Sequence, residues 1–184
     1  KNEDFGAFVS DITKTIAESD AADAEAAAGI AFGDGTIQDA LGAKFSELGE
    51  VIKIKRITRF TAEGNGAVSS YIHMGGKVGV MVEFGLENTA NATNETFKEL
   101  GLDVCLHIAA ANPMALDRDG IPADLVEEEK ALFAKQVEGK PENIVENILK
   151  GKLEKFYALN TLLEQGFVKD DKMSITELLA AKGK

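Results

Sequence analysis

Several residue types that build binding and catalytic sites are scarce in this chain of 184 residues, which has one cysteine, two histidines and no tryptophan. The single cysteine, Cys105, excludes an internal disulfide and the cysteine sets of structural zinc sites. Two histidines outside any HxH or HExxH pattern do not supply the three or four converging ligands of a metal site. We therefore expect no metal and no cofactor, and a reducing, cytoplasmic location.

Positive charge and long apolar runs are scarce as well. The chain has 20 Lys and Arg residues against 31 Asp and Glu residues, a net charge of −11. That balance disfavours nucleic acid and anionic membranes as partners, because both require local positive charge. No apolar run approaches the ~18 residues of a membrane span, and no signal peptide is recognisable. Because the sequence opens at Lys1 without Met, we expect it to be a piece of a longer protein.

The residues that are present form a patterned framework, with 45% apolar and 28% charged residues. Apolar residues at helical spacing predict helices over 2–19, 36–48 and 94–111, and further helices after Pro122, after Pro141, over 152–159 and after Ser174. β-Branched and alternating residues predict strands over 51–60, 68–73 and 77–84. Because the strands cluster between helices, we predict an α+β fold with antiparallel strands flanked by helices.

Capping residues mark several of these helix ends. Thr36 with Asp39, and Ser174 with Glu177, have the spacing of capping boxes at helix starts. Gly49 is placed to end the helix that Thr36 begins. Gly151 is predicted to separate two short helices, since glycine is unfavourable in a helix interior.

An internal repeat connects the two halves of the chain. After a shift of 92 positions, Asn2-Glu3-x-Phe5 matches Asn94-Glu95-x-Phe97. We therefore predict two related subdomains, 1–60 and 61–184, each with its own strands, and we expect Phe5 and Phe97 to be buried. A chance match between two amphipathic helices is the alternative.

Few residues qualify as functional on chemistry alone. His73 ends a strand just before a glycine turn, where binding residues collect, whereas His107 and Cys105 lie in an apolar helix and favour packing roles. Lys53, Lys55, Arg56 and Arg59 form a locally basic strand whose simplest interpretation is a solvated face. The glycine pairs lack the dinucleotide-binding context, and nothing assembles a nucleophile, a base and oxyanion donors. The residues alone therefore indicate a binding protein and not an enzyme.

A resemblance extends this interpretation. Residues 70–83 read S-Y-I-H-M-G-G-K-V-G-V-M-V-E and resemble the S-Y-x-H-x-G-G-[RK]-[IV]-G-V-[LM]-V-E segment of the translation elongation factor Ts family. Residues 107–113, 139–156 and 163–168 resemble further family segments, in the same order, and 48–56 resembles I-G-E-N-I-x-[IL]-R-R. The similarity covers nearly the whole chain.

The resemblance implies a role as guanine nucleotide exchange factor for elongation factor Tu in protein biosynthesis. The family core has two subdomains of related structure and acts by distorting the magnesium and phosphate sites of the GTPase, so that GDP leaves. Carried over by position, the contacts to elongation factor Tu are Leu48 and Gly49 in the first subdomain and His73 in the second, with Met74 and Gly75 flanking His73. The resemblance allows a homodimer or a heterotetramer, and it implies no direct contact with nucleic acid or membrane.

The sequence also departs from the family pattern. Of the segment T-D-F-V-A-[KR]-N only Lys1-Asn2 is present, and Thr89-Ala90 stands at the equivalent place in the second repeat, where the family's first copy has Asp-Phe. We therefore expect the chain as given to accelerate GDP release less than a longer form. Gly166 and Ile57 replace a family Pro and Arg.

Two other functions compete with exchange. The chain could be a dimerisation or scaffold module that has lost exchange activity, or a small enzyme that uses His73 as an acid–base group. A carboxylate paired with His73 in a pocket would favour the enzyme.

Overall fold

The computed structural model describes residues 3–139 and 141–183, so Lys1, Asn2 and Lys140, which belong to the matched motifs, lie outside the described residues. The chain divides into two compact units, unit 1 (Lys1–Phe60) and unit 2 (Thr61–Lys184). Helices and short antiparallel strand pairs make up both, so the α+β prediction is confirmed.

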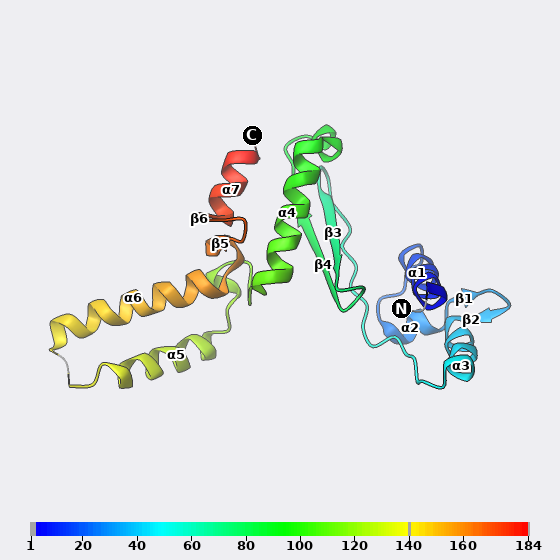
Figure 1. The fold of residues 1–184 in the computed structure, drawn as a ribbon, viewed down its shortest axis with the longest axis horizontal. Coiled ribbons are helices and arrows are strands. Elements are labelled where there is room, and N and C mark those ends of the chain that lie inside the picture. Colours follow the sequence, from blue (N-terminus) through cyan, green and yellow to red (C-terminus); the bar gives the residue numbers. More distant parts are fainter. Residues whose placement is uncertain (1–2, 140, 184) are drawn as a thin grey trace. The chain divides into compact units, whose positions relative to one another are not determined.

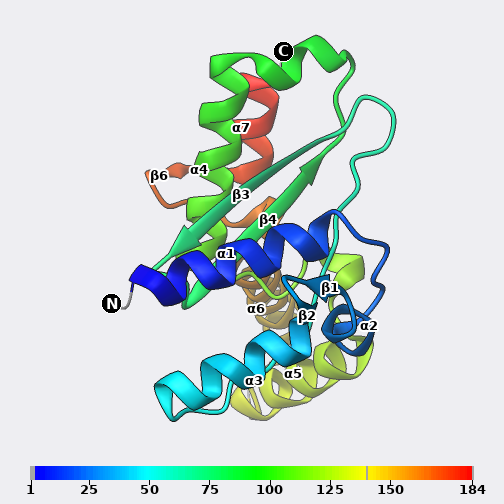
Figure 2. The same ribbon diagram turned by 90° about the vertical axis from the view of Figure 1, so that its right-hand side faces the viewer.

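Unit 1 is mainly helical. Its elements are α1 (Glu3–Ala17), α2 (Ala24–Ala28), β1 (Ala31–Phe32), β2 (Gly35–Thr36) and α3 (Ile37–Leu48). Figure 2 shows α1 and α3, with α2 and the β1–β2 pair beside them. The core joins Ile12 of α1 to Ile37 and Leu41 of α3, which are all at most 6% exposed. The short β1–β2 pair was not predicted.

The predicted strand over 51–60 is wrong, because the structure has neither strand nor helix over this segment. Its alternation is nevertheless real: Ile52 and Ile54 pack against the core of unit 1, while Lys53 and Lys55 are exposed. β-Branched residues favour an extended backbone, but a strand also needs a neighbour for its backbone groups, and the described part of unit 1 offers none at this segment.

Unit 2 begins with a long hairpin, one face of which packs against the helix that follows it. Its elements are β3 (Ala67–His73), β4 (Val78–Phe84), the 3₁₀ helix η1 (Thr89–Thr93), α4 (Glu95–Ala111), η2 (Arg118–Gly120), α5 (Ala123–Gln136), α6 (Glu142–Asn160), η3 (Leu162–Glu164), β5 (Gly166–Phe167), β6 (Asp170–Ser174) and α7 (Ile175–Lys182). Figure 1 shows α4 alongside β3 and β4, which pair antiparallel from Ala67↔Phe84 to His73↔Val78. The predicted hairpin is therefore confirmed.

The core of unit 2 lies between α4, the hairpin and the C-terminal elements. Leu100 and Val104 of α4 meet Phe167, Ile175 and Leu178, all at most 6% exposed. Phe97 packs edge to face on Phe84 with ring centroids 5.3 Å apart. It is half-buried, as is Phe5 in unit 1, so both rings are less buried than we predicted.

Helices α5 and α6 form a hairpin of their own (Figure 1). The two are tied by Lys152, whose Nζ donates to Gln136 Oε1 at 2.7 Å and lies over the Phe133 ring. Helix α6 continues through Gly151, so the predicted break there is wrong. A helix-interior glycine costs only about 1 kcal/mol, which packing against a neighbouring helix can offset.

Candidate partner-binding site

The hairpin tip carries three of the five predicted contact residues. β3 ends at His73, and the Gly76 N–H donates back to the His73 carbonyl at 3.1 Å, which closes a tight turn. Met74, Gly75 and Gly76 have φ angles of 49°, 66° and 100°, all in the left-handed region. Glycine adopts this region freely, whereas Met74 does so at a cost of order 1 kcal/mol. The sequence thus reverses the chain within four residues and leaves the tip protruding.

The tip presents apolar side chains together with one histidine. Met74 is 61% exposed, and Ile72, just before His73, is 65% exposed. His73 is exposed too, and its Nδ1 lies 2.8 Å from the hydroxyl oxygen of Tyr71. Flexible apolar groups beside a polar group that can hydrogen-bond are suited to contact with another protein.

The two faces of the hairpin differ. Its inner face packs Val80, Val82 and Phe84 toward α4, whereas Val68, Ile72 and Met81 point outward and are 40–65% exposed. Strand alternation separates the two sets. An apolar outer face is unusual for a solvated sheet and favours a macromolecular contact there.

The other two predicted contacts lie in unit 1, at the end of α3. Gly49 has φ 74°, and its N–H donates to the Phe45 carbonyl at 2.8 Å, so the predicted helix stop is confirmed. Leu48 is 37% exposed and Phe45 is 46% exposed, and neither belongs to the buried core of unit 1. The end of α3 therefore presents apolar surface to solvent.

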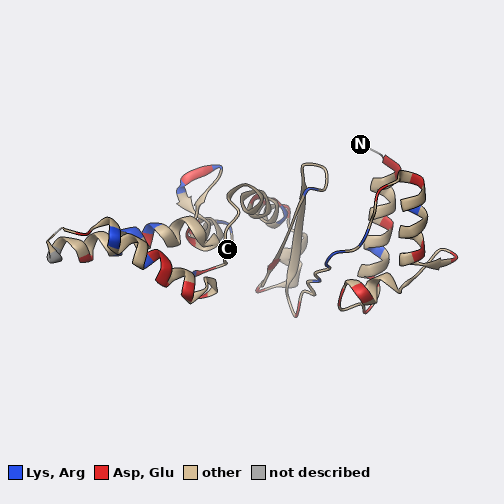
Figure 3. Cartoon of the chain, turned by 90° about the horizontal axis from the view of Figure 1, so that it is seen from below, with Lys and Arg blue, Asp and Glu red and all other residues tan. Residues whose placement is uncertain are grey.

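The basic residues of 51–60 divide between two roles. Figure 3 shows positive charge along this segment. Lys53, Lys55 and Arg56 are exposed, whereas the Arg59 guanidinium donates to the carbonyls of Ile16, Ala17 and Ser19 at 2.6–2.8 Å. Carbonyls at a helix C-terminus lack helical partners and carry partial negative charge, so Arg59 caps α1.

His107 and Cys105 are internal residues. Both are 0% exposed, and burial raises the pKa of the Cys105 thiol. His107 Nε2 is 2.9 Å from Gln165 Oε1, and its Nδ1 accepts the Val168 N–H at 3.3 Å. Because a backbone N–H only donates, Nδ1 must be the accepting nitrogen and Nε2 the protonated one. His107 thus fixes β5 against α4 and takes no part in an exposed site.

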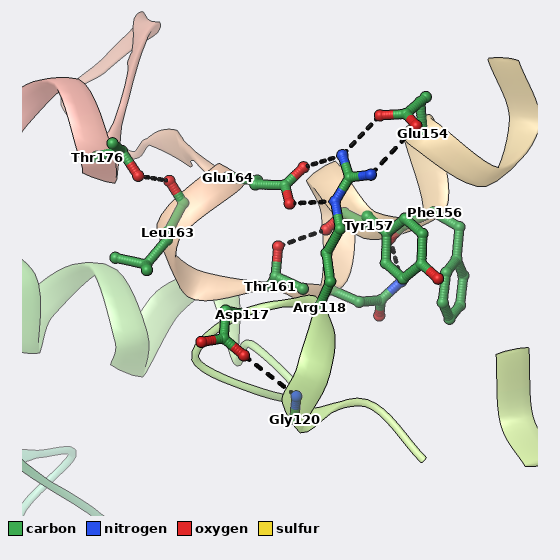
Figure 4. Close-up of polar contacts among 11 residues, drawn as sticks. Asp117, Arg118, Gly120, Glu154, Phe156, Tyr157, Thr161, Leu163, Glu164 and Thr176 are labelled. Atoms are coloured by element: carbon green, nitrogen blue, oxygen red, sulfur yellow. Dashed lines mark hydrogen bonds and ion pairs between the residues drawn. The ribbon is translucent and has the colours of Figure 1, made fainter. Parts of the chain in front are cut away.

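A polar cluster around Arg118, which sequence analysis did not detect, braces the base of the helical hairpin (Figure 4). Its guanidinium donates to Glu164 at 2.5 and 2.7 Å and to Glu154 at 2.6 and 3.1 Å, and it stacks 4.5 Å from the Tyr157 ring centroid. The hydrogen bonds from Arg118 lower the pKa of Glu164 and of Glu154, and those carboxylates raise the pKa of Arg118. This cluster links η2, η3 and α6.

Neither the ligand set of a metal site nor a helix that could span a membrane is present among the described residues. Across 3–139 and 141–183, no group of three or more His, Cys, Asp or Glu side chains is arranged to hold a metal ion. None of the helices in these ranges is both long and apolar enough to span a membrane.

Comparison with known proteins places these features in context. The family model described as "Elongation factor TS" matches residues 1–184. The chain is 39% identical over 187 residues to elongation factor Ts of Nautilia profundicola, covering 100% of this chain and 60% of that protein. It is 39% identical over 186 residues to that of Clostridium botulinum (100% and 60%) and 47% identical over 127 residues to that of Oleidesulfovibrio alaskensis (68% and 63%). The chain thus spans about 60% of the length of such relatives.

Proposed function

Since the chain belongs to the elongation factor Ts family, we propose that it acts in translation elongation as a guanine nucleotide exchange factor for elongation factor Tu. In this proposal it binds the GTPase, distorts the nucleotide site and so promotes release of GDP. It contributes binding surfaces and no catalytic group of its own.

The observation that carries the proposal is the hairpin tip. Four positions in a row are exposed, Ile72 and His73 at the end of β3 and Met74 and Gly75 in the left-handed turn that follows. A preformed tip loses little conformational entropy when it docks. The family resemblance assigns a contact to His73 at this place, and the exposure of His73 supports it.

The end of α3 is the second proposed contact surface. Leu48 and Phe45 are exposed apolar residues, and the left-handed Gly49 directs the chain away from the helix. Exposed leucine and phenylalanine at a helix end can fill apolar hollows of a partner, and a few such anchors supply most of the binding free energy of an interface. Unit 1 and unit 2 each contribute one such surface.

Exchange requires more than affinity. A ligand that binds two states of the GTPase equally shifts nothing, so the factor must favour the nucleotide-free state over the GDP-bound state. A tenfold preference, about 1.4 kcal/mol, lowers the affinity of the GTPase for GDP tenfold, because the coupling is reciprocal.

The test is stopped-flow release of a fluorescent GDP analogue from elongation factor Tu, together with calorimetric affinity for the nucleotide-free GTPase. We expect the chain to accelerate release, and His73→Ala to weaken binding by about 1–3 kcal/mol. Glu128→Ala, an exposed change on helix α5 away from both proposed contact surfaces, is the control and should leave both readouts unchanged. No acceleration at saturating chain, or equal affinity of the wild type and His73→Ala, would contradict the proposal.

A dimerisation or scaffold module is the second candidate, and the apolar outer face of β3–β4 favours it. Val68, Ile72 and Met81 form a surface that a second copy could cover. Sedimentation velocity distinguishes the two: concentration-dependent dimers without GDP release would support the scaffold.

We propose, in addition, that the chain is not an enzyme. The geometry of the tip supports this, since the hydrogen-bond partner of His73 is the Tyr71 phenol and not a carboxylate that would make it an acid–base pair.

A further inference from the structure

The Tyr71 hydroxyl and the His73 ring form a defined pair at the hairpin tip. Tyr71 Oη lies 2.8 Å from His73 Nδ1, and the two ring centroids are 5.6 Å apart with planes inclined by 35°. The residues are two apart on one strand, so both project from its inner face. Their strand partners, Val80 and Val78, are apolar and compete for neither hydrogen-bonding group.

The chemistry of the pair favours one arrangement of protons. A neutral imidazole has one N–H donor and one accepting nitrogen, and the phenol has one O–H that rotates freely. A phenol hydroxyl is a stronger donor than an imidazole N–H, and an imidazole nitrogen is a stronger acceptor than a phenol oxygen. The hydroxyl therefore donates to Nδ1, which leaves the proton of the neutral ring on Nε2.

We propose that Tyr71 is the positioning residue of His73, holding it in the Nε2–H tautomer so that the tip offers one N–H donor to a carbonyl or carboxylate oxygen of the partner. This inference rests on the proposed contact between His73 and elongation factor Tu. It specifies the chemistry of that contact, a hydrogen bond from the His73 ring to an acceptor on the partner. An acceptor on the partner can receive the Nε2–H of His73, whereas a donor at the same place would face a second donor, which disfavours binding.

The tautomer is measurable in the free chain. Ring ¹⁵N chemical shifts of the neutral His73 imidazole distinguish the two tautomers. We expect a predominantly Nε2–H ring in the wild type and a mixture in Tyr71→Phe, which keeps the aromatic ring and removes only the hydroxyl. Tyr157→Phe, in helix α6, is the matched control and should leave the His73 shifts unchanged. A mainly Nδ1–H ring in the wild type, or identical shifts in Tyr71→Phe, would overturn the proposal.

Binding variants test the use of that proton. In His73→Gln the amide nitrogen reaches the position of Nε2, whereas in His73→Asn it reaches only that of Nδ1. We therefore expect His73→Gln to bind elongation factor Tu more tightly than His73→Asn, and Tyr71→Phe to lose ~2–10-fold in affinity, the worth of one hydrogen bond. Equal affinities of the two His73 variants overturn the donor role. Failure of every form to bind refutes the proposed function instead, while the ring shifts still decide the tautomer.

Discussion

Replacing His107 by alanine tests how much of unit 2 depends on a buried hydrogen-bond network. The imidazole is 0% exposed and Gln165 is 5% exposed. The Gln165 amide nitrogen in turn donates a hydrogen bond to the Leu159 carbonyl at 2.8 Å. The variant removes a ring from the interior and leaves both Gln165 Oε1 and the Val168 N–H without their partner.

The expected cost follows from two contributions. A large-to-small change in a core costs about 2–5 kcal/mol, and a buried polar group left unpaired costs about 1–3 kcal/mol. Since the site can relax in part, we expect about 4 kcal/mol for His107→Ala. His107→Phe keeps a ring but not the hydrogen bonds, so it should cost about 2 kcal/mol.

Urea unfolding followed by tyrosine fluorescence measures this cost. Both tyrosines of the chain, Tyr71 and Tyr157, lie in unit 2, so the signal reports that unit. His73→Ala is the matched control, because it makes the same change at an exposed site, where a substitution typically shifts stability by at most about 0.5 kcal/mol. If His107→Ala proved no more destabilising than His73→Ala, the network would not support the fold and this reasoning would fail.

Three further predictions concern the hairpin and the base of α6. Gly101→Ala should destabilise unit 2 despite alanine's better helix propensity. A Cβ at this position would overlap the Ser69 hydroxyl and lie 2.9 Å from Ser69 Cβ. If this overlap is the cause, Ser69→Gly in the same chain should restore the melting temperature. Met74→Gly should raise stability by up to about 1 kcal/mol by relieving the left-handed backbone, yet weaken binding to elongation factor Tu, so unfolding and calorimetry should move in opposite directions. Arg118 lowers the pKa of Glu164 in the folded chain, so their ion pair stabilises the fold fully at pH values above the ordinary carboxyl pKa. This stabilisation is lost as the pH falls through the lowered pKa. Arg118→Met should therefore flatten the acid limb of the stability–pH curve, and an unaltered limb would contradict the assignment.

Local signals predicted much of the fold. The capping boxes at Thr36 and Ser174 and the stop at Gly49 stand where the residue types indicated, because a cap is satisfied within four residues of chain. The long hairpin followed from its glycine turn and alternation. What failed was non-local: 51–60 has strand-forming residues but no pairing strand within the described part of unit 1, and Gly151 lies in a helix that packs on a neighbour.

The candidate site shows the same division. His73, Met74 and Gly75 were found by their motif, and their exposure agrees with a contact role. The contact between Tyr71 and His73 could have been predicted from strand alternation, since residues two apart on a strand share a face. The Arg118 cluster could not be predicted from the sequence, because the partners of Arg118 are 36 and 46 residues away and no short pattern links them to it.

The cap that Arg59 places on α1 also has a consequence for synthesis. The arginine follows the carbonyl of Ala17 by 42 residues, and the core partners Ile52 and Ile54 arrive only shortly before it. At ~5–20 residues per second, about 2–8 seconds pass between the synthesis of α1 and that of the residues that cap and cover it. During that interval its last carbonyls depend on water and part of its apolar face is uncovered. The nascent first unit thus stays incompletely packed until its final ten residues have been synthesised.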